Sequence, residues 1–344
     1  MGISPGQRFR FEHYLSALKE QRWKFHVDSF YSWSGWKILY AQGRIPAKAW
    51  LVIRGFLKRI ITLFRALPYD YVYLYREAAP IGPPVFEWLL AKLFRKKIIY
   101  DFDDAIWIPV ASEQNKLALR LRAFWKVGVI CKWSYKVSVG NDYLGDFARQ
   151  YNPSVLLVPT VVNTRSGHDG VRDQASSSLV IGWTGTFSTL PYLQIILPVI
   201  QRMQEKIDFT FLVIADRDPK LPLKNYQFVR WNKATEKEDL LRMNIGVMPL
   251  YDDELSKGKC GFKAIQYMSL GIPAVVSPVG VNSIIVRDGQ EGFVCADETA
   301  WEEKLTLLLR DEVLRTDMAD ASRQRIEENY SVAATTDLFL KLFA

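Results

Sequence analysis

The sequence predicts an α/β protein built from two doubly wound domains. Short apolar runs alternate with helical patterns along most of the 344 residues, which is the β-α-β rhythm of a parallel sheet. A polar stretch containing Gly and Ser interrupts this rhythm near the middle of the chain, as an interdomain linker does. The chain is also longer than one hydrophobic core usually serves, so two domains are the starting expectation.

We expect the first domain to span residues 1–163. Its strands are expected at Tyr71–Tyr75, Lys97–Tyr100, Lys136–Val139 and Val155–Val158, with a helix at Phe86–Lys97. A doubly wound domain normally opens on an apolar strand, whereas this chain opens on a polar Gly-Pro segment and a helical pattern at Arg8–Gln21. The first strand is therefore expected to be missing, through a misassigned start codon or a natural truncation.

Residues 164–178 are the expected linker, residues 179–330 the second domain, and residues 331–344 a C-terminal helix. Strands of the second domain are expected at Leu179–Ile181, Phe209–Ile214, Gln227–Val229, Ile245–Met248 and Ala274–Ser277. Helices are expected at Tyr192–Glu205, Glu236–Met243 and Phe262–Leu270, and from Ala300 to the end of the chain. This order predicts a second parallel sheet covered by helices.

Composition indicates the compartment. Hydrophobic residues make up 49% of the chain and charged residues 24%, which is ordinary for a globular protein. The three cysteines form no CxxC pair, so we expect neither a disulfide framework nor a zinc site. No stretch approaches the roughly 18 apolar residues of a membrane-spanning helix, and the first residues lack the apolar core of a signal peptide. We therefore expect a cytoplasmic protein.

The net charge of +8 is unevenly distributed. Residues 1–150 hold 24 Lys and Arg against 12 Asp and Glu, whereas residues 151–344 hold 21 against 25. A basic half joined to a mildly acidic half suggests that the first half faces an anionic partner, either a lipid surface or nucleic acid.

The segment Trp50–Leu67 is basic and amphipathic. Its cations are Arg54, Lys58, Arg59 and Arg65, set among large apolar residues. Such a helix can lie in a membrane interface with its apolar face down and its cations on lipid headgroups. A second basic and aromatic stretch follows at Lys116–Lys136. The alternative is a pair of ordinary surface helices packed on the sheet.

The segment Lys257–Asn282 predicts a loop, a helix starting near Gly261 and Phe262, and a buried strand. A helix start offers unpaired backbone N–H groups and the positive end of the helix dipole. Lys257, Lys259 and Lys263 cluster at that end, so the sequence predicts a diphosphate-binding site there. The alternative is a solvated lysine-rich loop.

Two further features are weaker candidates for the same site. Gly182–Thr189 gives the order strand, Gly-rich loop, helix, which lets the backbone of Gly185 and Thr186 approach a phosphate. Trp231 follows a short strand and is a candidate for a position near a nucleotide base, although a packed tryptophan is equally ordinary.

Three carboxylates follow a buried strand of the first domain, namely Asp101, Asp103 and Asp104. Carboxylates beyond the carboxyl end of a strand lie where open α/β sheets place their sites. We therefore regard them as candidate catalytic residues, since negative charge there would stabilise a cationic transition state. The alternative is helix capping by Asp103 or Asp104.

Several segments together resemble one known family. The run Gln266–Val276 (QYMSLGIPAVV) is followed by Gly280–Val286, Asp288-Gly289 and Gly292-Phe293, and the chain opens with Gly6–Tyr14 (GQRFRFEHY). These segments resemble glycosyltransferase family 4, whose donor-binding signature is an E-x7-E motif followed by A-x-G-x-P-V-V. The resemblance covers most of the chain and is strongest in residues 179–330.

The resemblance implies the GT-B fold, with two Rossmann-like domains facing a cleft. It also implies retaining transfer of a sugar from a nucleotide-diphosphate sugar, without a metal or other cofactor. The second domain would hold the donor, with Lys263 and Lys259 stabilising the departing nucleotide and Gln266 holding the ribose. The acceptor, lipid-linked or saccharide, would dock on the first domain at the inner face of the plasma membrane, in bacterial envelope or exopolysaccharide synthesis.

The sequence departs from the family pattern at three places. Gln266 stands where the second glutamate is usual, and Gly258 where the first would fall. The Arg and Lys that the family tends to place after the first strand of the second domain are absent from Gly182–Thr189, so the three nearby lysines would supply the charge. We interpret the chain as a subfamily variant.

Other functions remain open from the sequence. An inactive, sugar-nucleotide-binding protein fits the missing glutamates. A nucleotide-sugar 2-epimerase would share the fold, but His13, His26 and His168 all lie outside the donor motif. A metal-binding D-x-D motif at Asp101–Asp103 would suggest a GT-A transferase, which the two-domain pattern disfavours. A pI near 9.2 would suit a nucleic-acid binder, yet no binding motif accompanies the charge.

Overall fold

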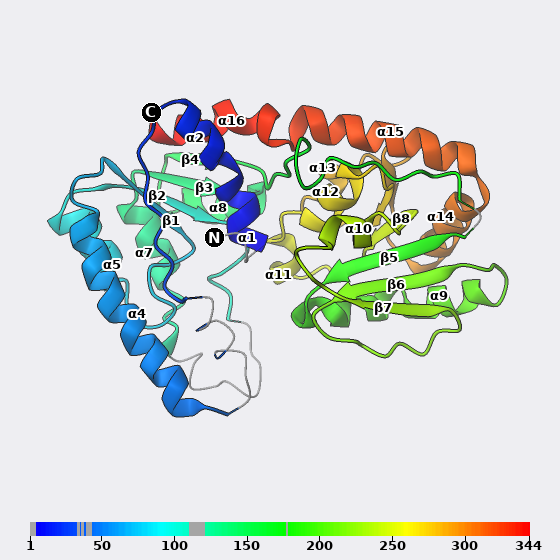
Figure 1. The fold of residues 1–344 in the computed structure, drawn as a ribbon, viewed down its shortest axis with the longest axis horizontal. Coiled ribbons are helices and arrows are strands. Elements are labelled where there is room, and N and C mark those ends of the chain that lie inside the picture. The colour runs from blue at the N-terminus through cyan, green and yellow to red at the C-terminus, as the bar shows by residue number, and fades with distance from the viewer. Residues whose placement is uncertain (1–4, 33–34, 36–37, 39–42, 110–120, 177) are drawn as a thin grey trace. The chain divides into compact units, whose positions relative to one another are not determined.

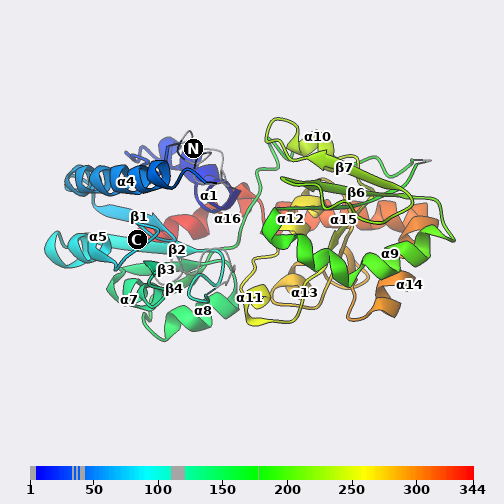
Figure 2. The same cartoon turned by 90° about the horizontal axis from the view of Figure 1, so that it is seen from below.

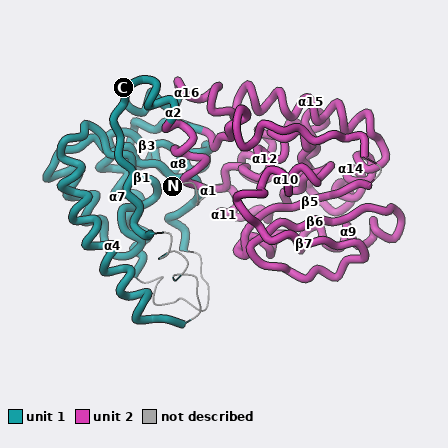
Figure 3. The backbone as a smooth tube through the Cα atoms, viewed as in Figure 1, with its two compact units in different colours: residues 1, 16–158, 338–344 teal, residues 2–15, 159–337 magenta. Residues whose placement is uncertain are grey.

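The computed structural model describes all residues except 1–4, 33–34, 36–37, 39–42, 110–120 and 177. The chain forms two compact units (Figure 3). Unit 1 comprises Ser16–Val158 and Leu338–Ala344, and unit 2 comprises Gly2–Leu15 and Pro159–Asp337. The units thus divide the chain at Val158 and again within the last helix, and the opening segment joins the second unit.

Unit 1 contains a four-stranded parallel sheet in the order β1-β2-β3-β4 (Figure 1). The strands are β1 Tyr71–Tyr75, β2 Lys97–Phe102, β3 Lys136–Val139 and β4 Val155–Leu157. The run KIIYDF of β2 is buried after its first residue, as is usual for a strand of a parallel sheet.

The main helices of unit 1 are α4 Ile45–Arg65, α7 Lys126–Trp133 and α8 Asp142–Arg149. Asn141 starts α8 by accepting a hydrogen bond from the Leu144 N–H at 2.9 Å. The expected helix at Phe86–Lys97 is shorter and irregular: it consists of α5 Val85–Trp88 and a π-helical turn, η2 Leu89–Leu93. Arg95 then adopts φ 49°, which ends the helical path before β2.

Unit 2 contains a six-stranded parallel sheet in the order β10-β9-β8-β5-β6-β7. Strands β6 and β7 of this sheet are labelled in Figure 2. Its strands are β5 Val180–Gly185, β6 Thr210–Ala215, β7 Tyr226–Arg230, β8 Ile245–Met248, β9 Ala274–Val276 and β10 Gly292–Val294. Numbered from β5, this is the strand order 3-2-1-4-5-6 of a Rossmann-type dinucleotide-binding fold.

Helices cover both faces of this sheet. The helices of unit 2 are η4 Phe187–Ile195, α9 Leu197–Gln204, α10 Glu236–Leu240, α11 Glu254–Lys257, α12 Phe262–Ser269, α13 Asn282–Ile285, α14 Glu298–Arg310 and α15 Glu312–Asn329. Helix α16 Val332–Leu340 begins in unit 2 and ends in unit 1, where η5 Lys341–Phe343 follows it. Aspartate caps start three of them, as at Asp311, whose carboxylate accepts from the Leu314 N–H at 2.9 Å. Two hydrophobic clusters, one on each side of the sheet, form the core.

The opening segment is helical, as expected, but broken into α1 Pro5–Arg10, η1 Glu12–Tyr14 and α2 Leu15–Glu20. Phe11 interrupts it with φ −142°. The α1 and η1 part is held in unit 2 by contacts remote in sequence. Val161 donates its N–H to the Phe9 carbonyl at 3.2 Å, and the Tyr14 hydroxyl bonds the Thr335 hydroxyl at 2.8 Å.

Within the described part of the chain, no helix combines the length and the apolar character needed to cross a membrane. Cys131, Cys260 and Cys295 are all buried thiols.

Candidate functional site

The sheet of unit 2 reverses its strand order between β5 and β8. The chain runs outward through β6 and β7 on one side and through β9 and β10 on the other. In open α/β sheets the crevice outside the carboxyl ends of such neighbours is the usual ligand site. The segments at this edge are the loop after β5, the loop after β8 and the start of α12.

Helix α12 begins without a side-chain cap. Gly261 occupies the N-cap at φ 63° and, as glycine, supplies no side-chain oxygen to the first N–H groups of the helix. A Cβ at this position would lie 2.1 Å from Cδ1 of Ile285, so both the backbone angle and the packing favour glycine. The helix start therefore combines donor N–H groups with the positive end of the dipole.

Two of the three expected lysines lie against aromatic side chains of the β5–η4 segment. The Lys263 ammonium is 5.5 Å from the centre of the Trp183 ring in β5. The Lys259 ammonium is 5.7 Å from the Tyr192 ring in η4. Both cations thus lie at the edge where β5 ends and α12 begins.

Lys257 is paired with carboxylates of its own segment. Its ammonium is bonded to Glu254 at 3.0 Å and lies 3.6 Å from Asp252. The Glu254 hydrogen bond and these charges raise the pKa of Lys257. Its charge is therefore balanced locally, so it adds less to the positive potential at α12 than the sequence suggested.

The loop after β5 is tightly packed. A Cβ on Gly185 would lie 2.3 Å from the Trp183 ring, so only glycine fits without displacing that side chain. Thr186 forms a capping box with Thr189 at the start of η4. Gly185 and Thr186 thus shape this edge through their backbone, and their expected approach to a phosphate stays a prediction.

The structure adds a cation that the sequence analysis missed. The Arg217 guanidinium lies 4.3 Å from the centre of the Phe187 ring, and the adjacent Asp216 accepts the Phe187 N–H at 2.6 Å. Both residues directly follow β6. Residues just beyond the carboxyl end of a strand are candidates for a site in an open α/β sheet. The same rule that singled out the carboxylates after β2 would therefore also have found Asp216 and Arg217.

Gln266 and Trp231 occupy more enclosed positions than expected. Gln266 lies in α12 and is only 4% exposed. The Trp231 indole N–H donates to the Glu236 carboxylate at 3.0 Å, and its ring packs on the core. Glu236 also accepts from Arg8 at 2.6 Å. The polar atom of Trp231 is therefore engaged within the protein, and its role here is to orient Glu236.

Phe262, the first residue of α12, packs against an aromatic ring of the opening segment. The Phe9 and Phe262 ring centres are 4.1 Å apart, and Phe9 is almost completely buried. The segment α1 thus covers the side chain of Phe262.

The three carboxylates after β2 have different environments in unit 1. Asp101 is completely buried within the strand. Asp103 accepts hydrogen bonds from the Tyr75 hydroxyl at 2.9 Å and from two guanidinium nitrogens of Arg76 at 2.9 and 2.7 Å. Burial raises the pKa of Tyr75 well above its usual value, so its hydroxyl remains a donor. Asp104 is the most open of the three, with a side chain 33% exposed.

Three of the α4 cations named from the sequence have contacts of two kinds. Arg59 turns inward: its guanidinium donates to the carbonyls of Ala78 at 2.7 Å and Asp28 at 3.1 Å, and burial lowers its pKa. Lys58 and Arg65 are more open, with ammonium and guanidinium 3.4 and 3.8 Å from the Asp28 carboxylate. The expectation that Arg59 faces a lipid surface is therefore not met by its contacts, because they anchor α4 to its own unit.

Comparison with known proteins gives the fold class. Sucrose-phosphate synthase from Thermosynechococcus elongatus superposes with a TM-score of 0.66 at 15% identity, covering 85% of this chain and 78% of that one. A glycosyltransferase from Rickettsia africae superposes with a TM-score of 0.63 at 11% sequence identity, covering 96% of this chain and 86% of that one. HepE from Anabaena has been solved with UDP and with UDP-glucose. These two structures superpose with TM-scores of 0.62 and 0.60 at 13% sequence identity, and each match covers 83% of this chain and 81% of that one. The chain has the GT-B fold.

The sequence itself identifies the class of enzyme. Residues 178–311 match the family model described as glycosyl transferases group 1. This stretch contains the sheet edge and the α12 start described above, and the chain is a glycosyltransferase. A search of curated protein sequences finds no match.

Proposed function

We propose that unit 2 binds a nucleotide-diphosphate sugar with its diphosphate at the start of α12. The observation that carries this proposal is the uncapped helix start at Gly261, with Lys259 and Lys263 at the same sheet edge. Backbone N–H groups, a helix dipole and ammonium groups together suit a pyrophosphate. The solved complexes of HepE with UDP and UDP-glucose support a nucleotide donor for a protein of this fold.

In the proposed reaction the nucleoside diphosphate leaves while the sugar passes to an acceptor hydroxyl. Lys263, Lys259 and the α12 N–H groups stabilise the negative charge that grows on the leaving group, and Arg217 adds positive potential from the neighbouring strand. This arrangement supplies the charge that a metal ion supplies elsewhere, so we propose metal-independent transfer. Retention of configuration is proposed from the family resemblance.

Lys263→Ala tests the diphosphate role, with Lys257→Ala as the matched control. Lys263→Ala is expected to lower turnover about 100-fold, the scale for loss of one group that stabilises transition-state charge. Lys257→Ala is expected to stay within about two-fold, because its charge is already balanced by Glu254 and Asp252. Equal turnover of Lys263→Ala and wild type would remove Lys263 from the mechanism.

The donor is identified by a thermal-shift screen with UDP-, GDP-, ADP- and dTDP-sugars. Binding to the native state raises Tm by mass action, so the preferred donor gives the largest shift. The same donors are then incubated with and without acceptor. Donor that is epimerised without acceptor would contradict transfer and favour a 2-epimerase.

We further propose that α4 places unit 1 on an anionic membrane surface. Its large apolar residues Trp50, Ile53, Leu57, Ile60, Ile61 and Phe64 recur every three or four positions and are each 47–61% exposed. That spacing puts them on one helix face. Arg54, Lys58 and Arg65 accompany this face, which is the composition of a helix lying in a lipid interface.

This placement agrees with a membrane-bound substrate. We propose a lipid-linked or saccharide acceptor of bacterial envelope or exopolysaccharide synthesis, bound through unit 1 at the cytoplasmic face of the plasma membrane. Asp104 is the carboxylate we assign to acceptor hydroxyls, because it is the most open of the three after β2. TarM, which shares the fold, has been solved with UDP, fondaparinux and an α-GlcNAc-glycerol.

Vesicle co-sedimentation tests the membrane proposal. Wild type is expected to bind phosphatidylglycerol vesicles and not phosphatidylcholine vesicles. The double variant Trp50→Ser and Phe64→Ser should bind about ten-fold more weakly, because the apolar area drives insertion. Val313→Ser, an exposed apolar residue of unit 2, is the control and should bind normally. Tighter binding to duplex DNA than to vesicles at physiological salt would contradict the proposal.

A further inference from the structure

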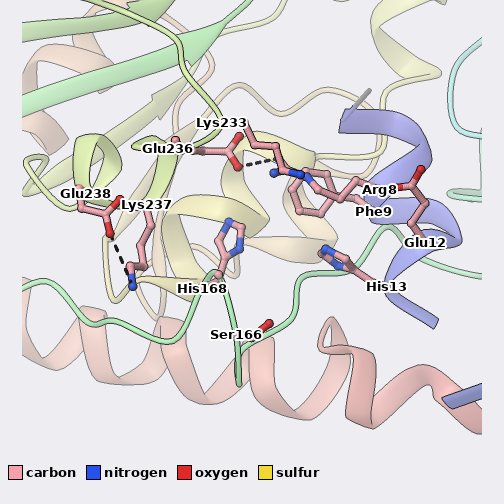
Figure 4. Close-up of a pocket in the computed structure, with 12 residues that line it drawn as sticks. Arg8, Phe9, Glu12, His13, Ser166, His168, Lys233, Glu236, Lys237 and Glu238 are labelled. Carbon is pink, nitrogen blue, oxygen red and sulfur yellow. Dashed lines mark hydrogen bonds and ion pairs between the residues drawn. The ribbon is translucent and has the colours of Figure 1, made fainter. Parts of the chain in front are cut away.

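A cavity in unit 2 lies between the α1–η1 segment, residues 5–14, and the rest of the unit (Figure 4). It encloses about 470 Å³. The α1–η1 segment forms one wall, and the other walls come from residues 166–168 and 233–238. The segment is therefore separated from the rest of unit 2 over part of its length, and the contacts beside the cavity hold it in place.

Charged side chains make the first of these contacts. Arg8 of α1 is bound to Glu236 of α10 at 2.6 Å, and both side chains are mostly buried. Breaking such a pair costs more than breaking an exposed one, because the remaining charge stays partly buried. Lys237, also at the cavity, is bound to Asp169 at 3.1 Å. These pairs balance each other's charge, and the first of them joins the α1–η1 segment to α10.

Phe9 makes the apolar part of the same attachment. Its side chain is 1% exposed. Its ring centre lies 4.1 Å from that of Phe262, and the Arg8 guanidinium lies over the ring, 4.2 Å from its centre. The Phe9 carbonyl accepts the Val161 N–H at 3.2 Å. Both the ring and the backbone of Phe9 are therefore fixed, and the ring holds the Phe262 side chain in turn.

The position of Phe262 matters for the proposed diphosphate site. Phe262 is the first residue of α12 and directly follows Gly261 in its left-handed conformation. The N–H groups of Phe262 and Lys263 are among those that a helix leaves without acceptors of its own. In a densely packed interior, a side chain that is held in one place also restrains the backbone that carries it. Phe9 therefore restrains the N–H groups at the start of α12.

The docking of the α1–η1 segment is not fully satisfied. His168 lines the cavity and is 4% exposed, and its Nε2 has no hydrogen-bond partner in the described part of the protein. Burial lowers the pKa of His168 to about 3 and that of His13 to about 4, so both imidazoles are uncharged at neutral pH. An unsatisfied buried polar atom destabilises the packed state. The segment is therefore expected to undock at a lower cost than the core unfolds.

We propose that the α1–η1 segment is a positioning element of the donor site, because docking of Phe9 on Phe262 sets the start of α12 for a diphosphate. Phe9 acts through Phe262, so it is a positioning residue. The proposal rests on the proposed function, since it takes the diphosphate to bind at α12. Coupling between two binding events is reciprocal, so a bound diphosphate also holds the α1–η1 segment more firmly.

Titration calorimetry with inorganic pyrophosphate tests the positioning role. Phe9→Ala should bind pyrophosphate about ten-fold more weakly than wild type, which is within the usual range for coupled sites. Phe9→Leu keeps most of the apolar volume and should recover part of the affinity. Glu236→Gln removes the ion pair with Arg8 from the other side of the contact, and it should weaken pyrophosphate in the same direction without any change to the Phe9 ring.

The matched controls are Phe209→Ala and Phe209→Leu. Phe209 is 2% exposed and belongs to the hydrophobic cluster of unit 2 that contains no α12 residue. These controls should lower Tm as the Phe9 variants do and leave the pyrophosphate affinity unchanged. Unfolding curves establish that each variant folds.

Hydrogen exchange tests the reciprocal effect in the wild-type protein. The backbone amides of residues 5–14 should exchange about ten-fold more slowly when pyrophosphate is saturating, since the coupling factor is the same in both directions. Amides of α9 are the reference and should not change.

Two results would overturn the positioning role. One is pyrophosphate binding to Phe9→Ala and Glu236→Gln as tightly as to wild type, and the other is exchange of residues 5–14 that pyrophosphate does not slow. Failure of wild type to bind pyrophosphate is a different outcome, and it would overturn the proposed function together with this inference.

Discussion

The carboxyl edges of the two sheets carry similar residues but use them differently. In unit 1, Asp103 accepts hydrogen bonds from Arg76 and Tyr75, so its negative charge stabilises the folded unit. In unit 2, the start of α12 has no side-chain cap, and Lys259 and Lys263 lie against aromatic rings. A position at a strand end therefore makes a charged residue a candidate for a site, and its contacts within the protein must be considered before a role is assigned to it.

The first prediction concerns Gly261, the glycine at the start of α12 in unit 2. Gly261→Ala forces a side chain onto φ 63° and against Ile285. We expect a loss of about 3 kcal/mol in the free energy of unfolding, from backbone strain and overpacking together. Nucleotide binding should fall as well, because the helix start shifts. Denaturant unfolding and calorimetry measure both. Gly170→Ala is the control, since a Cβ there would come no closer than 3.1 Å to the Leu241 side chain.

The second prediction sharpens the contrast within unit 1. Asp103→Ala leaves Arg76 and Tyr75 without their shared acceptor, and we expect about 2 kcal/mol less stability. Asp104→Ala should change stability by less than about 0.5 kcal/mol, as is usual for an open site, while lowering turnover. Urea unfolding and initial rates check the pair. Reversed effects, with Asp104 stabilising and Asp103 needed only for rate, would contradict the assignment.

The third prediction concerns His13 and His168 of unit 2. Their folded pKa values of about 4 and about 3 lie below the ordinary value of 6.5, so the unfolded chain binds protons first as the pH falls. Stability is complete above pH 6.5 and declines below it, by about 1 kcal/mol per histidine at pH 5.5. Tm measured between pH 7.5 and 5.5 should fall less in a His13→Gln, His168→Gln double variant. Parallel curves would show that these residues are not the cause.

The sequence was sufficient for the elements that depend on local pattern. The strands of both sheets appear near their expected positions, except for β10 Gly292–Val294, which was not expected. The success has a physical reason, because buried parallel strands are short apolar runs. The start of α12 at Phe262 follows from the Gly-containing loop before it. The π-helical turn after Trp88 was not predictable, since a helical pattern does not distinguish it from a regular helix.

Contacts between segments distant in the sequence could not be predicted from the sequence. Arg8 and Glu236 are 228 residues apart, and nothing local joins the opening segment to unit 2. The inward turn of Arg59 depends on the carbonyls of Asp28 and Ala78, which a helical wheel does not include. The cavity at His168 was missed for the same reason: its three segments meet only in the fold.

The most direct test of the account is a crystal structure with the preferred nucleoside diphosphate bound. The account predicts phosphate oxygens within hydrogen-bond distance of the backbone N–H groups of Phe262 and Lys263, with the Lys263 ammonium beside them. A diphosphate held instead by other cations, such as those of α4, with the start of α12 unoccupied, would contradict it.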